Sequence, residues 1–167
     1  MKSKQTVPMR KAKALKLIRK HQPSNPAAFV KLGFRLNYIG AGVFREVARI
    51  AGCDLVVKFP LIPEGDDEGP EGIAHSASEM QRIEKLARVA ELKPHLPKVF
   101  YFDRKNGIIV MQFYPELKPD AAVELLGKIV KKLVSRVGRV AMSDIHDGNV
   151  RRKRKGWDQL VFTDLGY

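Results

Sequence analysis

Oxygen-bearing side chains gather in two short segments near the end of the sequence. Asp144 and Asn149 lie within one hexapeptide, which also contains His146, and Asp164 follows a predicted strand. A carboxylate can accept the proton of a hydroxyl group, and amide and carboxylate oxygens can hold a metal ion against phosphates. Asp144 therefore fits a catalytic base, and Asn149 and Asp164 fit metal ligands. Asp-Gly-Asn is also an ordinary turn sequence, and these residues alone leave that alternative open.

Two glycines lie between two predicted strands. Gly40 and Gly42 separate the β-type runs at 34–39 and 44–50. Glycine lets backbone amides approach phosphate oxygens because it has no Cβ in the way. The pattern therefore fits a phosphate-binding loop, and a plain hairpin turn with two glycines is the alternative.

One lysine lies in an apolar strand. Lys58 belongs to the run 55–59, so its ammonium group is expected to point into a cleft that contains an anion. A solvent-facing strand lysine is the alternative. Glu79 shares a helix face with Ile83 and Leu86 and could reach Lys58, holding the lysine for phosphate. Glu84 is the other possible partner, and Glu79 could also be an exposed helix residue.

The elements around these residues predict an α+β fold. Five strands are expected at 34–39, 44–50, 55–59, 98–102 and 108–113, with an Asn-Gly hairpin signal at Asn106. Helical spacing covers 73–91 and an apolar stripe runs from 122 to 137. Short strands are expected around 150 and at 160–163.

The 167 residues fit one domain with a basic arm. The arm, residues 1–26, includes a possible short helix at 9–20, and the domain is expected to cover 27–167. Net charge is +13, which implies attraction to polyanions. The single cysteine, Cys53, excludes an internal disulfide and is expected to be structural. No apolar run is long enough to cross a membrane, and we expect a cytoplasmic protein without a membrane partner.

From Tyr38 onward these motifs, in this order, resemble the protein kinase superfamily. Gly40 and Gly42 resemble its glycine-rich loop, Lys58 its strand lysine and Glu79 the helix partner of that lysine. Asp144, with His146 two residues later, is similar to the catalytic loop of RIO-type and aminoglycoside kinases. The resemblance implies two lobes: a five-stranded antiparallel sheet with one helix at about 27–114, and a much reduced helical lobe at about 115–167.

The resemblance also implies a nucleotide site for ATP and Mg²⁺. Val47 and Val56 would cover the adenine, and Met111 would be the gatekeeper residue. The backbone from Gln112 through Phe113 to Tyr114 would bind the adenine edge. Asp144 would be the catalytic aspartate and Asn149 and Asp164 the metal ligands, while His146 would touch the transferring phosphate.

Several positions depart from the family pattern. Arg45 replaces the third loop glycine, Met142-Ser143 replaces the usual His-Arg, and Arg151 stands where an apolar floor under adenine is expected. The sequence ends at Tyr167, soon after Asp164, as in the minimal phage-encoded serine/threonine kinases it resembles. Small-molecule kinases place their substrate pocket beyond this point, which favours a protein substrate or autophosphorylation.

Three functions follow from these patterns. The first is an active Mg-dependent serine/threonine kinase, which the full set of predicted site residues favours. The second is a pseudokinase that docks a partner or binds nucleotide, which the departures at Arg45 and Arg151 favour. The third is a nucleic-acid-binding protein, because the arm and the run 151–155 are basic. The same two segments could instead bind an acidic protein, and 151–155 could be a solvated hairpin tip.

Overall fold

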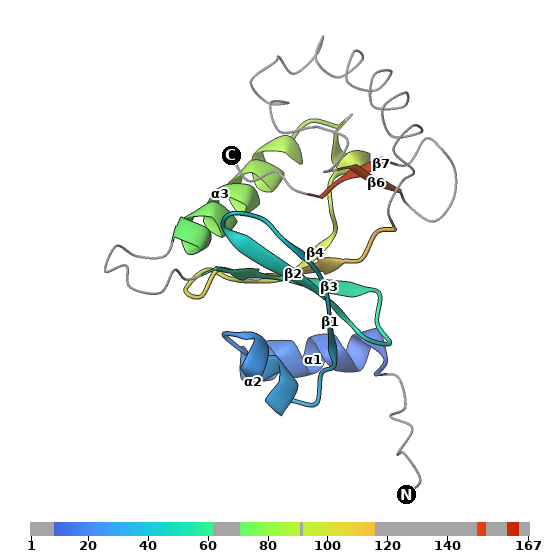
Figure 1. Ribbon diagram of the computed structural model, residues 1–167. Coiled ribbons are helices and arrows are strands. Elements are labelled where there is room, and N and C mark those ends of the chain that lie inside the picture. Colours follow the sequence, from blue (N-terminus) through green and yellow to red (C-terminus); the bar gives the residue numbers. More distant parts are fainter. Residues whose placement is uncertain (1–8, 62–70, 91, 116–149, 153–159, 164–167) are drawn as a thin grey trace, which may run out of the picture. The chain divides into compact units, whose positions relative to one another are not determined.

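The protein has an α+β fold built on a five-stranded antiparallel sheet (Figure 1). The computed structural model describes residues 9–61, 71–90, 92–115, 150–152 and 160–163. The chain divides into two compact units. The first, called here the sheet unit, comprises Met1–Ala74 and Val99–Phe113, and the second comprises His75–Lys98 and Tyr114–Tyr167. The predicted fold class and the antiparallel five-stranded sheet are therefore confirmed.

The sheet has the strand order β1-β2-β3-β5-β4, and every neighbouring pair is antiparallel. The strand ends differ from the predicted ends by at most two residues. The strands are β1 Leu36–Ala41, β2 Arg45–Ile50, β3 Leu55–Pro60, β4 Val99–Asp103 and β5 Ile108–Gln112.

The turn between β4 and β5 forms where the Asn-Gly signal predicted it. Asp103 Oδ1 accepts hydrogen bonds from the N–H groups of Lys105 and Asn106, at 3.0 and 3.2 Å. Gly107 has a φ of 64°, a left-handed conformation that glycine adopts without strain. Local chemistry therefore determines this hairpin.

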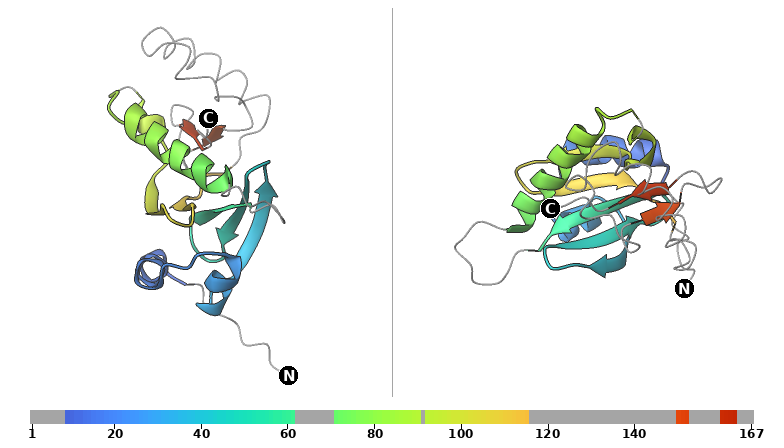
Figure 2. Two further views of the ribbon diagram at one scale, coloured as in Figure 1. Left: turned by 90° about the vertical axis from the view of Figure 1, so that its left-hand side faces the viewer. Right: turned by 90° about the horizontal axis from the view of Figure 1, so that it is seen from above.

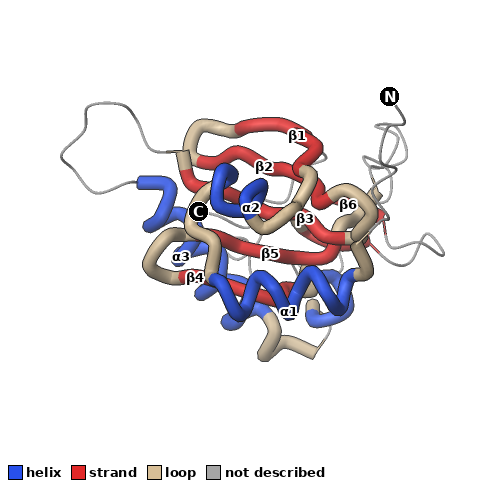
Figure 3. Tube along the Cα trace, turned by 90° about the horizontal axis from the view of Figure 1, so that it is seen from below, coloured by secondary structure: helices blue, strands red, loops and turns tan. Residues whose placement is uncertain are grey.

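Two helices cover one face of the sheet (Figures 2 and 3). In α1, Lys11–His21, Ala14 and Ile18 are fully buried. In α2, Pro26–Lys31, Phe29 is fully buried. Asn25 begins α2, because its side chain accepts the N–H of Ala28 at 2.8 Å and a proline follows at the first helical position. This helix was not predicted, although Asn25-Pro26 is a helix-start signal.

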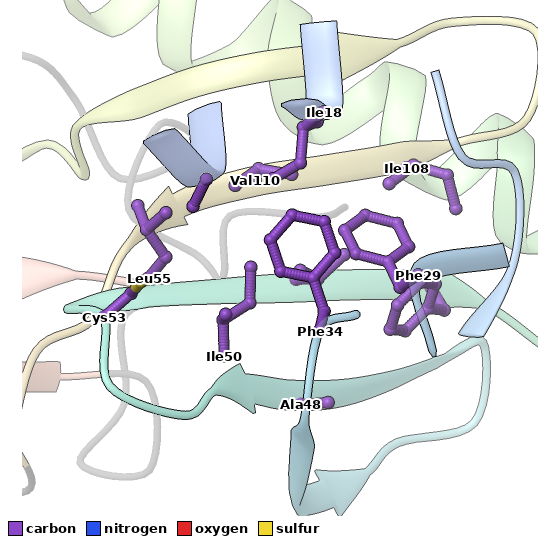
Figure 4. Close-up of a cluster of buried hydrophobic side chains, with 12 residues drawn as sticks. Ile18, Phe29, Phe34, Ala48, Ile50, Cys53, Leu55, Ile108 and Val110 are labelled. Carbon is purple, nitrogen blue, oxygen red and sulfur yellow. The ribbon is translucent and has the colours of Figure 1, made fainter. Parts of the chain in front are cut away.

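The hydrophobic core of the sheet unit lies between these helices and the sheet (Figure 4). Phe29 stacks edge-on against Phe59, with ring centroids 5.3 Å apart, and is tilted against Phe34 at 5.6 Å. The strands contribute alternate residues, since side chains alternate between the two faces of a strand. The buried cluster consists of Ala14, Ile18, Phe29, Phe34, Ala48, Ile50, Cys53, Leu55, Val57, Phe59, Ile108 and Val110.

The expectation of a separate basic arm at 1–26 needs correction for α1. Two buried side chains attach this helix to the core, and two of its basic residues contact β4. Lys11 Nζ lies 4.1 Å from the centroid of the Phe100 ring, and Arg19 Nη2 donates to the Phe100 carbonyl at 3.2 Å. The domain therefore begins no later than α1. Residues 1–8 lie outside the described residues.

The helix α3, Glu71–Leu86, begins in the sheet unit and continues into the second unit. It starts two residues before the predicted position and ends before the predicted 91, where the chain forms turns and a short 3-10 helix, η1, at Lys93–His95. The second unit also contains the antiparallel pair β6, Val150–Arg152, and β7, Leu160–Phe162. Both short strands were predicted.

The remaining predictions for the second lobe fall outside the described residues. They include the helical stripe at 122–137 and the reduced helical lobe at 115–167. Among the helices that the structure describes, none combines the length and apolarity that crossing a bilayer would require.

Candidate functional site

Gly40, Val47 and Lys58 form one row across three neighbouring strands. β1 and β2 pair Gly40 with Val47, and β2 and β3 pair Val47 with Lys58. Directly paired residues lie on the same face of a sheet. The strand register therefore brings together three residues that the sequence assigned to one site.

A second row lies beside the first on the same face. Val56 pairs with Met111, and Val56 is two residues from Lys58, so both side chains point to the same side of β3. Val57, between them, points into the core cluster on the opposite face. Val47, Val56, Lys58 and Met111 thus share the face that α1 and α2 do not cover.

Lys58 is a buried charge on this face. Only 4% of its surface is exposed, and the other residues of β3 are apolar. The alternative of a solvent-facing strand lysine is therefore wrong. Removing an ammonium group from water is costly unless negative charge compensates it. Lys58 therefore places a buried positive charge on this face.

The two glycines before β2 are not required by the fold. A Cβ built on Gly40 or on Gly42 would meet no atom within 4 Å, and neither residue has a positive φ. An alanine could therefore occupy either position without a clash or backbone strain. The open space over Gly40 and Gly42 is the kind of space that a ligand close to the backbone would fill.

Arg45 is a second buried cation on the same face. It begins β2, two residues before Val47, and only 5% of its surface is exposed. In the sequence, Arg45 is a departure from the glycine pattern of the loop. Its position adds a guanidinium group to the face that holds Lys58. The signal was available, because a basic residue that ends a glycine-containing turn can contact an anion bound there.

The end of β5 is attached to its surroundings by three contacts. The N–H of Phe113 donates to the carbonyl of Asp54 at 3.0 Å. The Arg49 guanidinium lies 4.0 Å from the centroid of the Phe113 ring, and Lys11 Nζ donates to Gln112 Oε1. The Phe113 N–H is therefore already bonded within the protein, and the adenine contact expected at the backbone from Gln112 through Phe113 to Tyr114 stays a prediction.

Tyr114 begins the last segment of the second unit. Its hydroxyl oxygen accepts the backbone N–H of Lys98 at 3.1 Å. Burial raises the pKa of Tyr114 above its ordinary value, outweighing the effect of that hydrogen bond. The phenol therefore stays neutral near pH 7, and its role is to hold this segment against the chain before β4.

Glu79 belongs to the buried side of α3. The buried positions of the helix are Gly72, Ser76, Glu79, Ile83 and Leu86, which recur at the spacing of one helical face. Glu79 is fully buried, whereas Glu84 is exposed. The helix position therefore favours Glu79 over Glu84 as the functional carboxylate, and the reading of Glu79 as an exposed residue is wrong.

The predicted catalytic and metal residues lie outside the described residues. They are Asp144, His146, Asn149 and Asp164. The hairpin beside them is described: Val150, which follows Asn149, pairs with Phe162, which precedes Asp164 by two residues. Val161 and Phe162 are buried, and the rings of Phe162 and His95 lie 5.8 Å apart. The hairpin therefore holds together the chain neighbours of the two predicted metal ligands.

Within the described ranges, no group of three or more His, Cys, Asp or Glu side chains could hold a metal ion. Arg151, predicted at the adenine floor, is half-buried in β6.

No protein-family model matches the chain, and no curated protein sequence matches it. Solved structures are similar to it. The structure of an apo pseudokinase matches 99% of this chain with 12% identity and a TM-score of 0.52. The apo form of PpkA-294 matches 80% with 21% identity and a TM-score of 0.48. APH(2")-IIa in a ternary complex with streptomycin and ATP matches 96% with 12% identity and a TM-score of 0.47.

The chain spans 58% of the length of PpkA-294, 63% of the pseudokinase and 73% of APH(2")-IIa. At this level of identity the likeness concerns the fold. The match to the pseudokinase extends over nearly the whole chain, and the sheet carries Lys58 and the glycine turn in the order that the sequence resemblance implied. The chain has the protein kinase-like fold.

Proposed function

We propose that the protein is an ATP-dependent phosphotransferase, and specifically a serine/threonine protein kinase that uses Mg²⁺. One observation carries the proposal: Lys58 is buried on the sheet face that also holds Gly40, and the fold itself requires neither Gly40 nor Gly42, in the turn that follows. A phosphate chain accounts for both, since it needs a cation and close approach to the backbone.

The residues of the sheet unit fit the parts of ATP. The ammonium of Lys58 and the guanidinium of Arg45 supply positive charge for phosphates. Val47, Val56 and Met111 supply apolar surface for a purine on the same face. Gly40 lies in the row of Val47 and Lys58, so the glycine turn adjoins both the apolar and the charged parts of this face.

The chemical step is assigned from the sequence motifs. Asp144 would accept the proton of the attacking hydroxyl group, and His146 would contact the transferring phosphate. Asn149 and Asp164 would hold Mg²⁺, which when bound neutralises phosphate charge. The pairing of Val150 with Phe162 supports this assignment. Val150 follows Asn149 directly and Phe162 lies two residues before Asp164, so the pairing brings together the chain segments next to both predicted metal ligands.

The proposed acceptor is a hydroxyl group of a protein, including this chain itself, and the proposed compartment is the cytoplasm, where ATP and Mg²⁺ are present. Incubating the purified protein with γ-labelled ATP and Mg²⁺ tests both the activity and the acceptor. We expect label on the protein or on an added protein acceptor, and none on an added aminoglycoside.

Two matched variants make this assay decisive. Asp164→Ala should abolish labelling, because a metal ligand is lost, whereas Glu84→Ala should retain it, because Glu84 is an exposed carboxylate on α3. Equal labelling by Asp164→Ala and the wild type would refute the proposal.

A second candidate is a nucleotide-binding pseudokinase. Arg45 favours it, because its buried side chain stands where kinases have the third loop glycine. The fold similarity to an apo pseudokinase is consistent with it. Stabilisation by Mg-ATP in a thermal shift experiment, without any transfer of label, would favour this candidate over the first.

A further inference from the structure

Three lysines form a straight ridge on the outer side of α1. Lys13, Lys16 and Lys20 are spaced by three and four residues, so they lie above one another on one helix face. All three are exposed, and they point away from the side on which Ala14 and Ile18 are buried. At 1.5 Å per residue the ridge is about 10 Å long. We call these three residues the lysine ridge.

No acidic residue lies near the lysine ridge in the sequence. Glu46 is the first acidic residue of the sequence, so nothing in α1, α2 or β1 can neutralise the ridge locally. The three lysines form no ion pair or hydrogen bond with the part of the chain that the structure describes. Positive charge is therefore concentrated on an exposed face of α1.

This arrangement works against the stability of α1. Like charges three and four residues apart repel each other, and Lys13 lies in the first turn, where the helix dipole is unfavourable to a cation. No acidic residue occupies that turn. Other basic residues of α1 make structural contacts, as Lys11 and Arg19 do with Phe100. The lysine ridge makes none, so packing does not explain it.

We propose that the lysine ridge binds the phosphate backbone of a nucleic acid. Lysine binds phosphate as a compact point charge, without the bidentate geometry that arginine provides for phosphate and carboxylate alike. A regular row of cations on a convex helix matches the regular row of charges along a nucleic acid strand. The ridge contains no aromatic or amide side chain that could stack on bases or read them, so binding is independent of base sequence.

This interaction does not depend on the proposed phosphotransferase activity. The test compares two triple variants of the full chain that each lose three positive charges. The first replaces the ridge: Lys13→Gln, Lys16→Gln and Lys20→Gln. The matched control replaces three exposed lysines elsewhere: Lys31→Gln, Lys85→Gln and Lys105→Gln. Both sets keep the chain length and place an uncharged residue of similar helix propensity at each position.

Binding is measured by fluorescence anisotropy with a labelled short duplex DNA of random sequence, over a range of salt concentrations. The ridge variant should bind at least about tenfold more weakly, and its slope of log affinity against log salt should fall by about 2 to 3, as expected for three lost phosphate contacts. The control variant should keep the wild-type slope to within about 1. Circular dichroism should show that both variants retain their helices.

Three outcomes would overturn the proposal. The first is no binding of the duplex by the wild type at low salt. The second is an equal loss in both variants, which would mean a general attraction of a basic protein. The third is that the ridge variant loses binding to polyglutamate or to phosphatidylserine vesicles but not to the duplex, which would assign the ridge to an acidic protein or to a membrane surface.

Discussion

Gly72 of α3 lies against the main-chain carbonyl of Phe44, in the turn between β1 and β2. A Cβ on Gly72 would be 2.5 Å from that oxygen and 2.8 Å from Cβ of Pro60. The same carbonyl accepts the N–H of Leu61 at 2.8 Å. The first turn of α3 is therefore packed directly on the backbone of the glycine turn and on the end of β3.

Gly72→Ala should destabilise the protein. Alanine normally stabilises a helix by about 1 kcal/mol relative to glycine, but here its methyl group would overlap a backbone oxygen, and overpacking costs about 1–3 kcal/mol. We expect a lower melting temperature in a thermal denaturation experiment. Gly40→Ala is the control, because its methyl group would meet no atom. If Gly72→Ala melted at or above the wild-type temperature, the close packing of α3 on Phe44 would be disproved.

Gly40→Ala and Gly42→Ala should weaken nucleotide binding without lowering stability. Their methyl groups would occupy the open space that we assign to phosphates, and nothing in the folded protein opposes them. We expect affinity for Mg-ATP to fall about tenfold, which corresponds to about 1.4 kcal/mol. Isothermal titration calorimetry measures this change. Unaltered affinity in both variants would show that this space is not part of the nucleotide site.

Lys58→Met and Glu79→Gln test whether the two residues act as a pair. Each single change should reduce phosphoryl transfer by about 100-fold or more, and the double variant should be little worse than either single variant, because residues that act as a unit are not additive. Glu84→Gln, at an exposed position of the same helix, should remain within about twofold of the wild type. Additive losses in the double variant would mean that Lys58 and Glu79 act independently.

Ile18→Ala should show that α1 belongs to the folded core. Ile18 is fully buried between α1 and the sheet, and truncating such a side chain costs about 2–5 kcal/mol. Urea denaturation measures the free energy of unfolding. Val30→Ala removes apolar atoms from a side chain that is 57% exposed, and it should cost no more than about 0.5 kcal/mol. If α1 were part of a detached arm, Ile18→Ala would lower the free energy of unfolding as little as Val30→Ala does.

Cys53 should be protected from alkylation in the folded protein. Burial, and secondarily the carboxylate of Asp54, raise the pKa of its thiol, although Lys11 opposes the shift. The protonated thiol also donates to the carbonyl of Met9 at 2.6 Å. The reactive species is the thiolate, so iodoacetamide at pH 8 should modify Cys53 much more slowly in the native state than in denaturant. Equal rates in the two states would contradict this environment.

The raised pKa of Cys53 also gives a pH dependence of stability with a defined sign. The unfolded thiol ionises near its ordinary pKa of 9.0, whereas the folded thiol keeps its proton to higher pH. The folded state therefore binds more protons than the unfolded state in this interval. The contribution of Cys53 to the free energy of unfolding is complete below pH 9.0 and decreases as pH rises through the folded-state pKa. Cys53→Ala should lose less stability than the wild type between pH 8 and pH 10, as measured by urea denaturation.

The sequence by itself determined the strands and the turn between β4 and β5. Strand patterns and the Asn106-Gly107 pair depend on residues close together in the chain, so reading them requires no knowledge of the fold. The sequence also singled out Lys58 and Glu79 by residue type. It left open whether each was buried or exposed, and it left Glu84 as an alternative to Glu79.

Only the tertiary structure decided those questions, because burial depends on contacts between segments that are distant in sequence. The pairing of Val47 with Lys58 set the face of the sheet on which the lysine is buried. The packing of Ala14 and Ile18 made α1 part of the core, although its charge pattern alone is typical of a separate arm. The close approach of Gly72 to Phe44 showed that the fold needs a glycine at position 72, and the empty space over Gly40 and Gly42 showed that it does not need glycine at those two positions.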